Sequence, residues 1–260
     1  MKSQVTDMTF YDAHLTYGVS SDVNLTPPKP CRTIEELDAA LIRAGVSGGL
    51  VFGEAPDNAG VVIGNRMLAE DLKKVKSDLY GLYTIVPRFT HEIPSAADLP
   101  AVLGRDKMAG IRMSPATNRW LPKPGIIADY LEMACELRIP VFFDTKRGIT
   151  LGEIYDILER FPALTCILSY KNIWPADRYY RPFIAQFPNL HMELSSMITD
   201  QGIDKLVDEY GAERFLFGSG FPWMYIGGQQ MQLRHACISE EDKNLIASGN
   251  LLRLIKEARI

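Results

Sequence analysis

Apolar residues follow two alternating patterns along this chain. Short runs rich in Val, Ile, Leu and Phe are typical of buried strands, and longer segments with apolar residues at every third or fourth position are typical of amphipathic helices. The candidate strands cover residues 8–15, 49–52, 79–86, 109–113, 141–145, 165–169, 191–194 and 215–218. Their alternation with helical segments predicts βαβ units and an α/β fold. Eight units fit a single (β/α)8 TIM barrel, which typically takes ~250 residues, so we expect one domain over residues 1–260.

Local signals predict where several of the helices begin and end. Two capping boxes place a threonine three residues before a glutamate, a spacing that satisfies free amides in a first helical turn: Thr33 with Glu36, and Thr150 with Glu153. Gly45 is suited to a left-handed cap after the first of these helices. Ser239 predicts the start of the last helix, which continues to Ile255.

The longer irregular segments each follow a candidate strand, at residues 20–31, 53–60, 87–94 and 114–124. Loops that follow barrel strands gather at the carboxyl-terminal face, where binding sites of this fold are built. The length of these loops therefore predicts a ligand mouth on that face.

Composition excludes several classes of protein. With 47% hydrophobic and 23% charged residues the chain is an ordinary globular protein, and its net charge of -4 gives no global attraction for nucleic acid or an anionic membrane. No apolar run approaches a membrane span and the first nine residues lack a signal-peptide core, so we expect a cytoplasmic protein. The four cysteines are widely spaced and are interpreted as thiols acting as small apolar residues: Cys31, Cys135, Cys166 and Cys237.

Several segments together resemble the amidohydrolase-related family of TIM-barrel hydrolases and decarboxylases. The strongest likeness is the closing segment GAERFLFGSGFPW at residues 211–223. The other matching segments are YDAHLTYG at 11–18, GIR at 110–112, FPALTCIL at 161–168, ISEEDK at 238–243 and GNLLRL at 249–254. The resemblance covers nearly the whole chain and implies a metal site at the barrel mouth.

The residues at the family's metal positions depart from its pattern. That pattern has Asp-x-His-x-His on the first strand, a histidine ending the fifth, Gly-His after the sixth and an aspartate after the eighth. The chain keeps Asp12 and His14. The remaining positions hold, in chain order, Thr16, Asp144, Ser169-Tyr170 and Gly220. Because catalytic zinc generally takes three protein ligands, and only His14 and Asp144 remain to supply them, we expect no metal and no other cofactor.

The charged and polar residues just past the strand ends predict a locally positive mouth that favours a small anionic ligand: His14, Arg112, Asp144, Lys146, Arg147, Tyr170, Lys171 and Glu193. Arg112 is suited to clamp a carboxylate or phosphate, because its planar fork binds two oxygens at once. Trp223 adds an apolar wall for a ring-bearing ligand. The predicted substrate-binding set is Arg112, Lys146, Arg147, Glu193 and Trp223.

The predicted catalytic set is His14, Asp144, Tyr170 and Lys171. In this hypothesis His14 and Asp144 move protons, while Tyr170 and Lys171 stabilise developing negative charge. A structural interpretation stands beside it: Asp144 neutralises a neighbouring cation, His14 is a satisfied core histidine, and Lys146 and Arg147 are solvated loop charges.

Two functions follow from these alternatives. The first is a metal-independent hydrolase of lactones or esters, or a decarboxylase, acting on a small anionic organic acid, as the resemblance implies. The second is a catalytically inactive ligand-binding or assembly protein. Members of the family are often oligomeric, so we also expect a homo-oligomer, with no nucleic-acid or membrane partner.

Overall fold

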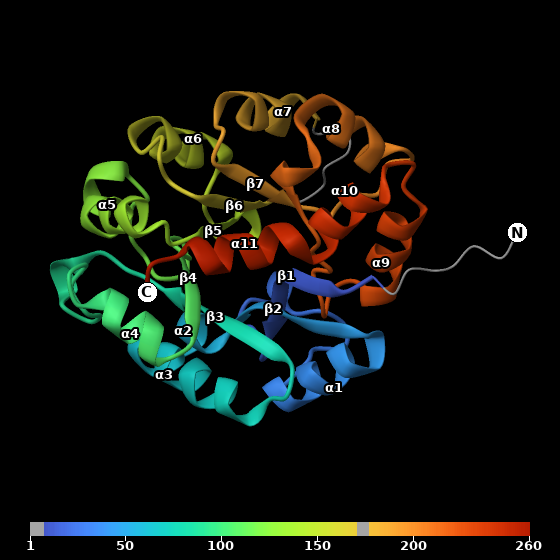
Figure 1. Cartoon of the computed structure of the whole chain (residues 1–260). Helices are drawn as coiled ribbons and strands as arrows, with labels where there is room; N and C mark the ends of the chain where they lie inside the picture. Colours follow the sequence, from blue (N-terminus) through green and yellow to red (C-terminus); the bar gives the residue numbers. More distant parts are fainter. Residues whose placement is uncertain (1–7, 171–176) are drawn as a thin grey trace, which may run out of the picture.

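The eight predicted strands form one parallel sheet whose strand order is the chain order (Figure 1). This computed structural model describes residues 8–170 and 177–260. The strands are β1 Phe10–Tyr17, β2 Val46–Gly53, β3 Asp78–Thr84, β4 Met108–Arg112, β5 Val141–Asp144, β6 Cys166–Ser169, β7 Leu190–Glu193 and β8 Phe215–Leu216. The segment after β8 closes the sheet onto β1, because Ala13 donates its amide to the Phe217 carbonyl at 2.8 Å. The predicted TIM barrel is confirmed.

Helices surround the barrel and follow its strands in sequence (Figure 1). They are α1 Ile34–Ala44, α2 Ala55–Asn58, α3 Val61–Asp71, α4 Leu99–Arg105, α5 Ala128–Leu137, α6 Leu151–Arg160, α7 Asp177–Gln186, α8 Gly202–Tyr210, α9 Ile226–His235, α10 Glu240–Asn244 and α11 Asn250–Glu257. Among the residues that the structure describes, no helix has both the length and the apolar character needed to cross a bilayer.

The predicted helix caps are present. Thr150 accepts from the Glu153 amide and Glu153 reaches back to the Thr150 amide, which completes the capping box of α6. Thr33 and Ser239 also cap α1 and α10 through their side-chain oxygens. Glu36 accepts from the Arg32 amide at 2.8 Å instead of the Thr33 amide, so the predicted reciprocal box of α1 is not formed. Gly45 adopts the left-handed conformation at φ 68°, where a residue without a Cβ avoids strain.

The last helix differs from the continuous one that we predicted. A wider π-helical turn at Leu245–Gly249 separates α10 from α11. The carbonyl of Ile246 in this turn accepts from the amide of Phe217, at 2.8 Å, just after β8. The π turn and this long-range bond to the barrel therefore occur at the same point of the helix.

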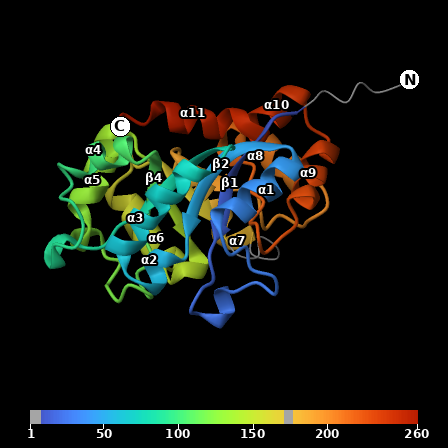
Figure 2. The ribbon, with the colours of Figure 1, turned by 90° about the horizontal axis from the view of Figure 1, so that it is seen from below.

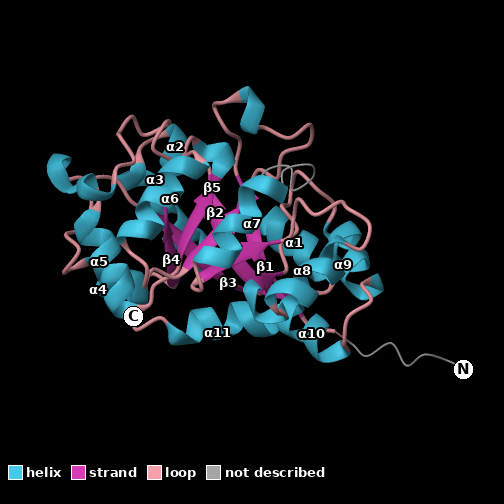
Figure 3. Ribbon diagram, turned by 90° about the horizontal axis from the view of Figure 1, so that it is seen from above, coloured by secondary structure: helices cyan, strands magenta, loops and turns pink. Residues whose placement is uncertain are grey.

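The interior of the barrel is apolar and α11 closes its amino-terminal end. Leu251 and Leu254 of α11 pack on interior residues from most of the strands: Ala13, Leu50, Phe52, Leu82, Ala109, Phe142, Ile167 and Leu216. Asn250 fixes the helix by donating to the carbonyls of Ala212 and Phe215, both at 2.9 Å. In Figures 2 and 3, α10 and α11 lie at one end and the long loops at the other, so any site must form at the loop end.

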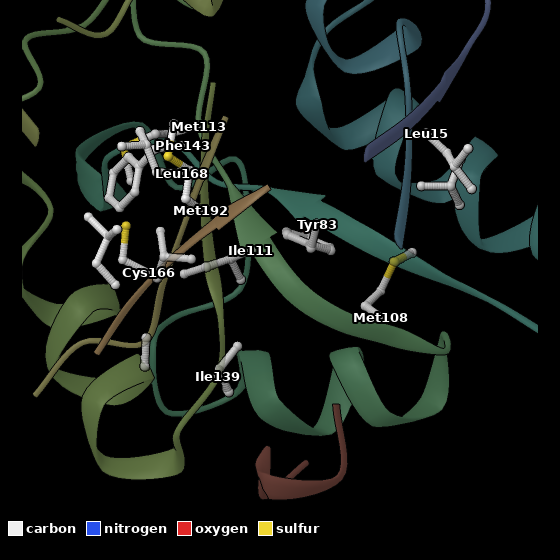
Figure 4. Packing of buried hydrophobic residues seen from close by; sticks show 14 of the residues in the cluster. Leu15, Tyr83, Met108, Ile111, Met113, Ile139, Phe143, Cys166, Leu168 and Met192 are labelled. Carbon is white, nitrogen blue, oxygen red and sulfur yellow. The ribbon is translucent and has the colours of Figure 1, made fainter. Parts of the chain in front are cut away.

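A second, larger core fills the space between the outer faces of the strands and the helices. Figure 4 shows part of it, where Ile111 of β4, Phe143 of β5 and Leu168 of β6 pack together with Met113 and Met192. The residues that alternate with these along each strand point into the barrel. Because the strands are closely packed on both faces, their ends and the site that they carry are held in fixed positions.

His191 on β7 is a buried base between the outer-core residues Leu190 and Met192, so it points into the barrel. Burial lowers the pKa of its imidazole to about 4, assisted by the nearby charges of Arg253 and Arg214, and its Nδ1 lies 3.1 Å from the Glu213 carbonyl. Since the unfolded pKa is higher than the folded one, the unfolded chain binds the additional proton. Stability from this group is therefore present above about pH 6.5 and lost as the pH falls toward about 4.

The unfolding free energy of the wild type falls between about pH 6.5 and 4 because the unfolded chain binds a proton at His191. We predict that this fall is smaller by about 2–3 kcal/mol in His191→Asn, which retains a donor near the Nδ1 position. Urea denaturation at a series of pH values measures this difference. His235→Asn, at an exposed histidine on α9, is the control and leaves the slope unchanged. Identical slopes in the wild type and in His191→Asn would contradict the assignment.

Candidate active site at the carboxyl end of the barrel

A histidine and a glutamate from opposite parts of the sequence form a buried pair at the barrel mouth. His14 Nδ1 of β1 donates to Glu193 Oε1 of β7 at 3.1 Å. The imidazole stacks on Phe52 with 6.0 Å between ring centroids and meets Phe142 edge-on at 5.4 Å. Both side chains of the pair are buried, and their low-polarity surroundings strengthen the interaction between imidazole and carboxylate.

Two serines complete the surroundings of Glu193. Ser195 donates its amide to Oε2 and its hydroxyl to Oε1, both at 2.8 Å, and Ser169 Oγ lies 3.2 Å from His14 Nδ1. Burial alone raises the pKa of Glu193, but the charge and hydrogen bond of His14, with the serine donors, lower it to about 2. Glu193 is therefore an ionised carboxylate throughout the physiological range.

The environment of His14 favours its protonated form. Burial by itself lowers the pKa of the imidazole, but the charge and hydrogen bond of Glu193, followed by the charge of Asp144, raise it above its usual value. The bonds of His14 are made at Nδ1, and within the described residues Nε2 has no hydrogen-bond partner. In the protonated imidazole, Nε2 therefore carries a proton that no described residue accepts.

The structure changes our expectation for the partner of His14. We predicted Asp144 as the carboxylate of a proton-transfer pair, and the direct partner is Glu193, which we had placed among the substrate-binding residues. Asp144 Oδ1 instead accepts from the Lys146 amide at 2.9 Å, and its Oδ2 lies 3.6 Å from Arg147 Nε. Asp144 acts on His14 through its charge.

Two arginines and two carboxylates form a second buried cluster beside this pair. Arg147 binds Glu54 through two bonds of 2.7 and 2.5 Å and lies 3.3 Å from Asp57. Arg112 donates to the same Asp57 oxygen at 2.9 Å and also bonds Ser114. All four charged side chains are at most 4% exposed. Arg147 is therefore not a solvated loop charge.

Both guanidinium groups of this arginine cluster lie near one aromatic ring. The carbon at the centre of the Arg112 guanidinium is 4.4 Å from the centroid of Phe52, and that of Arg147 is 5.2 Å away. Phe52 also stacks on His14, so this ring separates the cations from the imidazole. Three groups that carry positive charge therefore surround the Phe52 ring.

Glu54 and Asp57 were missed by our sequence interpretation. We counted four cations against two anions at the mouth, and these two additional carboxylates offset the predicted positive excess. Both lie in the irregular segment after β2, which we had identified as one of the long loops. The available signal was two acidic residues shortly after the end of a predicted strand, at positions 54 and 57.

The remaining predicted residues lie around the rim. Lys146 Nζ is 5.8 Å from the centroid of the half-exposed Trp223 ring. Tyr170 is half-buried, with its ring 6.3 Å from that of Tyr180. Lys171 lies outside the described residues. The structure brings together His14, Glu193, Asp144, Arg147 and Arg112, and it places Lys146 and Trp223 side by side at the rim.

The donors at the inherited metal positions do not fit a catalytic metal. Asp12 Oδ1 accepts from the amides of His14 and Ser219, both at 2.9 Å, and burial raises the pKa of this carboxyl to about 6. Thr16 donates to Glu54. Gly220 has φ 65°, and a Cβ there would lie 3.1 Å from the Ser195 Cβ, so a ligand side chain would be strained. In residues 8–170 and 177–260, no cluster of three or more His, Cys, Asp or Glu is arranged to hold a metal ion.

Comparison with known proteins gives one family match. The model of a family described as amidohydrolase matches residues 33–256. A search of curated protein sequences returned no significant match.

Solved structures share the fold at low sequence identity. An uncharacterised TIM-barrel protein from Bordetella bronchiseptica is 18% identical with a TM-score of 0.67, covering 87% of this chain and 83% of that one. A 2,6-dihydroxybenzoate decarboxylase from Rhizobium is 14% identical with a TM-score of 0.70, covering 96% and 99%. A 5-carboxyvanillate decarboxylase from Sphingomonas paucimobilis is 14% identical with a TM-score of 0.67, also covering 96% and 99%. These likenesses concern the fold.

Proposed function

Because the chain belongs to the amidohydrolase family, we propose that it is a hydrolase or decarboxylase that acts without a metal on a small anionic organic acid. The observation that carries the proposal is the buried His14–Glu193 pair at the barrel mouth, joined at 3.1 Å through His14 Nδ1. Similar folds include decarboxylases of hydroxylated aromatic acids, which supports an aromatic or unsaturated carboxylate as the substrate class.

Proton transfer from His14 is the central step of this proposal. Glu193 accepts from Nδ1 and thereby fixes the orientation of the imidazolium, whose Nε2 then gives its proton to the substrate. In decarboxylation the proton goes to the carbon that loses its carboxylate, the carbon–carbon bond breaks, and carbon dioxide leaves. In ester or lactone hydrolysis, water adds to the carbonyl carbon and the proton goes to the departing oxygen.

Decarboxylation fits the electrostatics better than hydrolysis. The raised pKa of His14 favours the protonated imidazole, which is an acid, whereas hydrolysis first requires a base to activate water. With His14 as the acid, turnover falls as the pH rises through the imidazole pKa. Histidine regains its proton from solvent after each cycle, so the overall reaction converts a carboxylate and a proton into carbon dioxide and the protonated product.

The substrate carboxylate is assigned to Lys146. Arg112 and Arg147 are already paired with Glu54 and Asp57, whereas Lys146 makes no ion pair with a described residue. Its ammonium lies near the ring of Trp223, which offers a flat surface for an unsaturated substrate. The predicted roles of Arg112 and Arg147 in binding the anion become those of supporting the walls of the site.

A screen of chelator-treated protein against hydroxylated benzoates and carboxylated lactones tests the proposal, with carbon dioxide release and product formation as readouts. His14→Gln is expected to lower turnover about 100-fold or more, the usual contribution of a general acid. His235→Gln at the exposed position on α9 is the matched control. Turnover that survives His14→Gln, or that requires added zinc, would refute this assignment.

A ligand-binding protein without catalysis is the second candidate. The observation in its favour is that Arg112 and Arg147 form ion pairs with internal carboxylates and are not free to bind a substrate anion. It predicts that a bound carboxylate is recovered unchanged after prolonged incubation at high protein concentration. If a converted product is detected and its formation requires His14, the protein is an enzyme and this second candidate is ruled out.

A further inference from the structure

A cavity of about 580 Å³ lies between the loops that follow β2, β3 and β4. This volume is within the range of small-molecule pockets, ~300–1,000 Å³. Apolar side chains supply much of its lining, including Val61, Val86, Phe89 and Leu121. None of the predicted site residues lines it.

Three polar side chains of this cavity carry atoms without a hydrogen-bond partner. They are Oδ1 of Asp57, Oδ1 of Asn118 and Nε1 of Trp120, and all three atoms are covered from solvent. Buried polar atoms are nearly always paired, and unpaired ones are costly. Three in one cavity, two acceptors and one donor, indicate that a further group belongs there.

The backbone of the loop after β4 supports this interpretation. Arg119, between Asn118 and Trp120, adopts a left-handed conformation at φ 59°. A residue with a side chain is strained in this conformation, and such strain clusters at ligand-binding segments. Asn118 and Trp120, on either side of this residue, both line the cavity.

We infer that this cavity binds a small neutral aromatic molecule whose polar head both donates and accepts hydrogen bonds, such as a carboxamide. Binding turns the three covered atoms towards the cavity, so that the head donates to Asp57 and Asn118 and accepts from Trp120, while the ring occupies the apolar part. A neutral ligand is required because the Asp57 charge is already matched by Arg112 and Arg147.

Asp57 connects the cavity with the candidate active site. Its Oδ2 accepts from Arg112, Arg147 and Ser114, whereas its Oδ1 is the unpaired atom of the cavity. A ligand bound at Oδ1 therefore touches the carboxylate that holds both arginines. The inference does not depend on the proposed function, because it concerns binding alone.

Titration with benzamide, followed by calorimetry and by ligand-observed NMR, tests the inference. We expect saturable binding at about millimolar concentration or below, the range for so small a ligand. Trp120→Phe keeps the ring and removes the N–H donor, so it is expected to weaken binding about 3- to 10-fold, the effect of one neutral hydrogen bond. Toluene, which lacks the polar head, is expected to bind more weakly than benzamide.

Two further variants separate this cavity from the barrel mouth. Thr117→Phe places a ring into the cavity from an exposed rim position and is expected to abolish benzamide binding. Trp223→Phe is the matched control, at a tryptophan outside the cavity, and leaves binding unchanged. No saturable binding, binding equal for toluene, or binding that responds to Trp223→Phe and not to Trp120→Phe or Thr117→Phe would overturn the inference.

Discussion

Replacing Arg147 by methionine is expected to lower the free energy of unfolding by about 3–5 kcal/mol, the effect of removing one partner from a buried ion pair. The guanidinium is 3% exposed and neutralises Glu54 and Asp57 at once, with Asp144 nearby. Methionine fills much of the space but leaves these carboxylates buried without their cation. Urea denaturation followed by circular dichroism measures the loss.

The matched control is a lysine in an exposed ion pair. Lys123 is 3.4 Å from Asp156, and both side chains are at least half exposed. Solvent-exposed pairs typically contribute ~0–1 kcal/mol, so Lys123→Met is expected to change stability little. A loss below about 1 kcal/mol for Arg147→Met would show that the cluster does not hold the loop after β2.

A double variant separates the loss of the cation from the loss of packing. In Arg147→Met combined with Glu54→Leu, the carboxylate most closely bound to Arg147 is removed as well. Replacing both charges by apolar groups is commonly much less costly than removing one. The double variant is therefore expected to be more stable than Arg147→Met alone.

The barrel was predictable because its signals are local. Apolar runs mark the strands, and caps such as Thr150 with Glu153 fix helix starts within a few residues of sequence. These patterns were sufficient for eight strands and their order. The π turn at Leu245–Gly249 was not predictable in this way, because no local signal marks it, and its bond with Phe217 joins two distant segments.

The pairing within the site could not be read from the sequence for the same reason. His14 and Glu193 are 179 residues apart, and Arg147 and Glu54 are 93 apart. Strand ends told us which residues gather at the mouth, but not which carboxylate meets which cation. The pairing depends on the direction of each side chain at its strand end. In the structure Glu193, and not Asp144, is hydrogen-bonded to His14.

The closing segment shows how a departure from a family pattern carries structural information. Gly220, where the family has an aspartate, also has a left-handed backbone. Gly218, two residues earlier, lies directly against the Glu193 carboxylate. The sequence therefore indicated a missing ligand, whereas the structure shows that the same segment packs against the Glu193 carboxylate.

We expect Gly218→Ala to disrupt the packing of this segment against Glu193 and to lower the free energy of unfolding by about 3–5 kcal/mol. A Cβ at this position would overlap Glu193 Oε2. Overpacking costs ~1–3 kcal/mol, and the loss of the charge-assisted bonds from Ser195 and His14 adds ~1.5–3 kcal/mol. Turnover by the proposed mechanism falls as well, because the imidazole loses its orientation.

The pKa of His14 provides the readout that distinguishes this effect from general destabilisation. Displacing Glu193 removes the charge that raises the imidazole pKa, while burial continues to lower it, so the His14 pKa is expected to fall in Gly218→Ala. Histidine NMR titration measures this shift. Gly228→Ala is the matched control, because a Cβ there meets nothing within 4 Å, and in helix α9 alanine is expected to stabilise by ~0.5–1 kcal/mol. An unchanged His14 pKa in a folded Gly218→Ala protein would mean that Gly218 does not position Glu193.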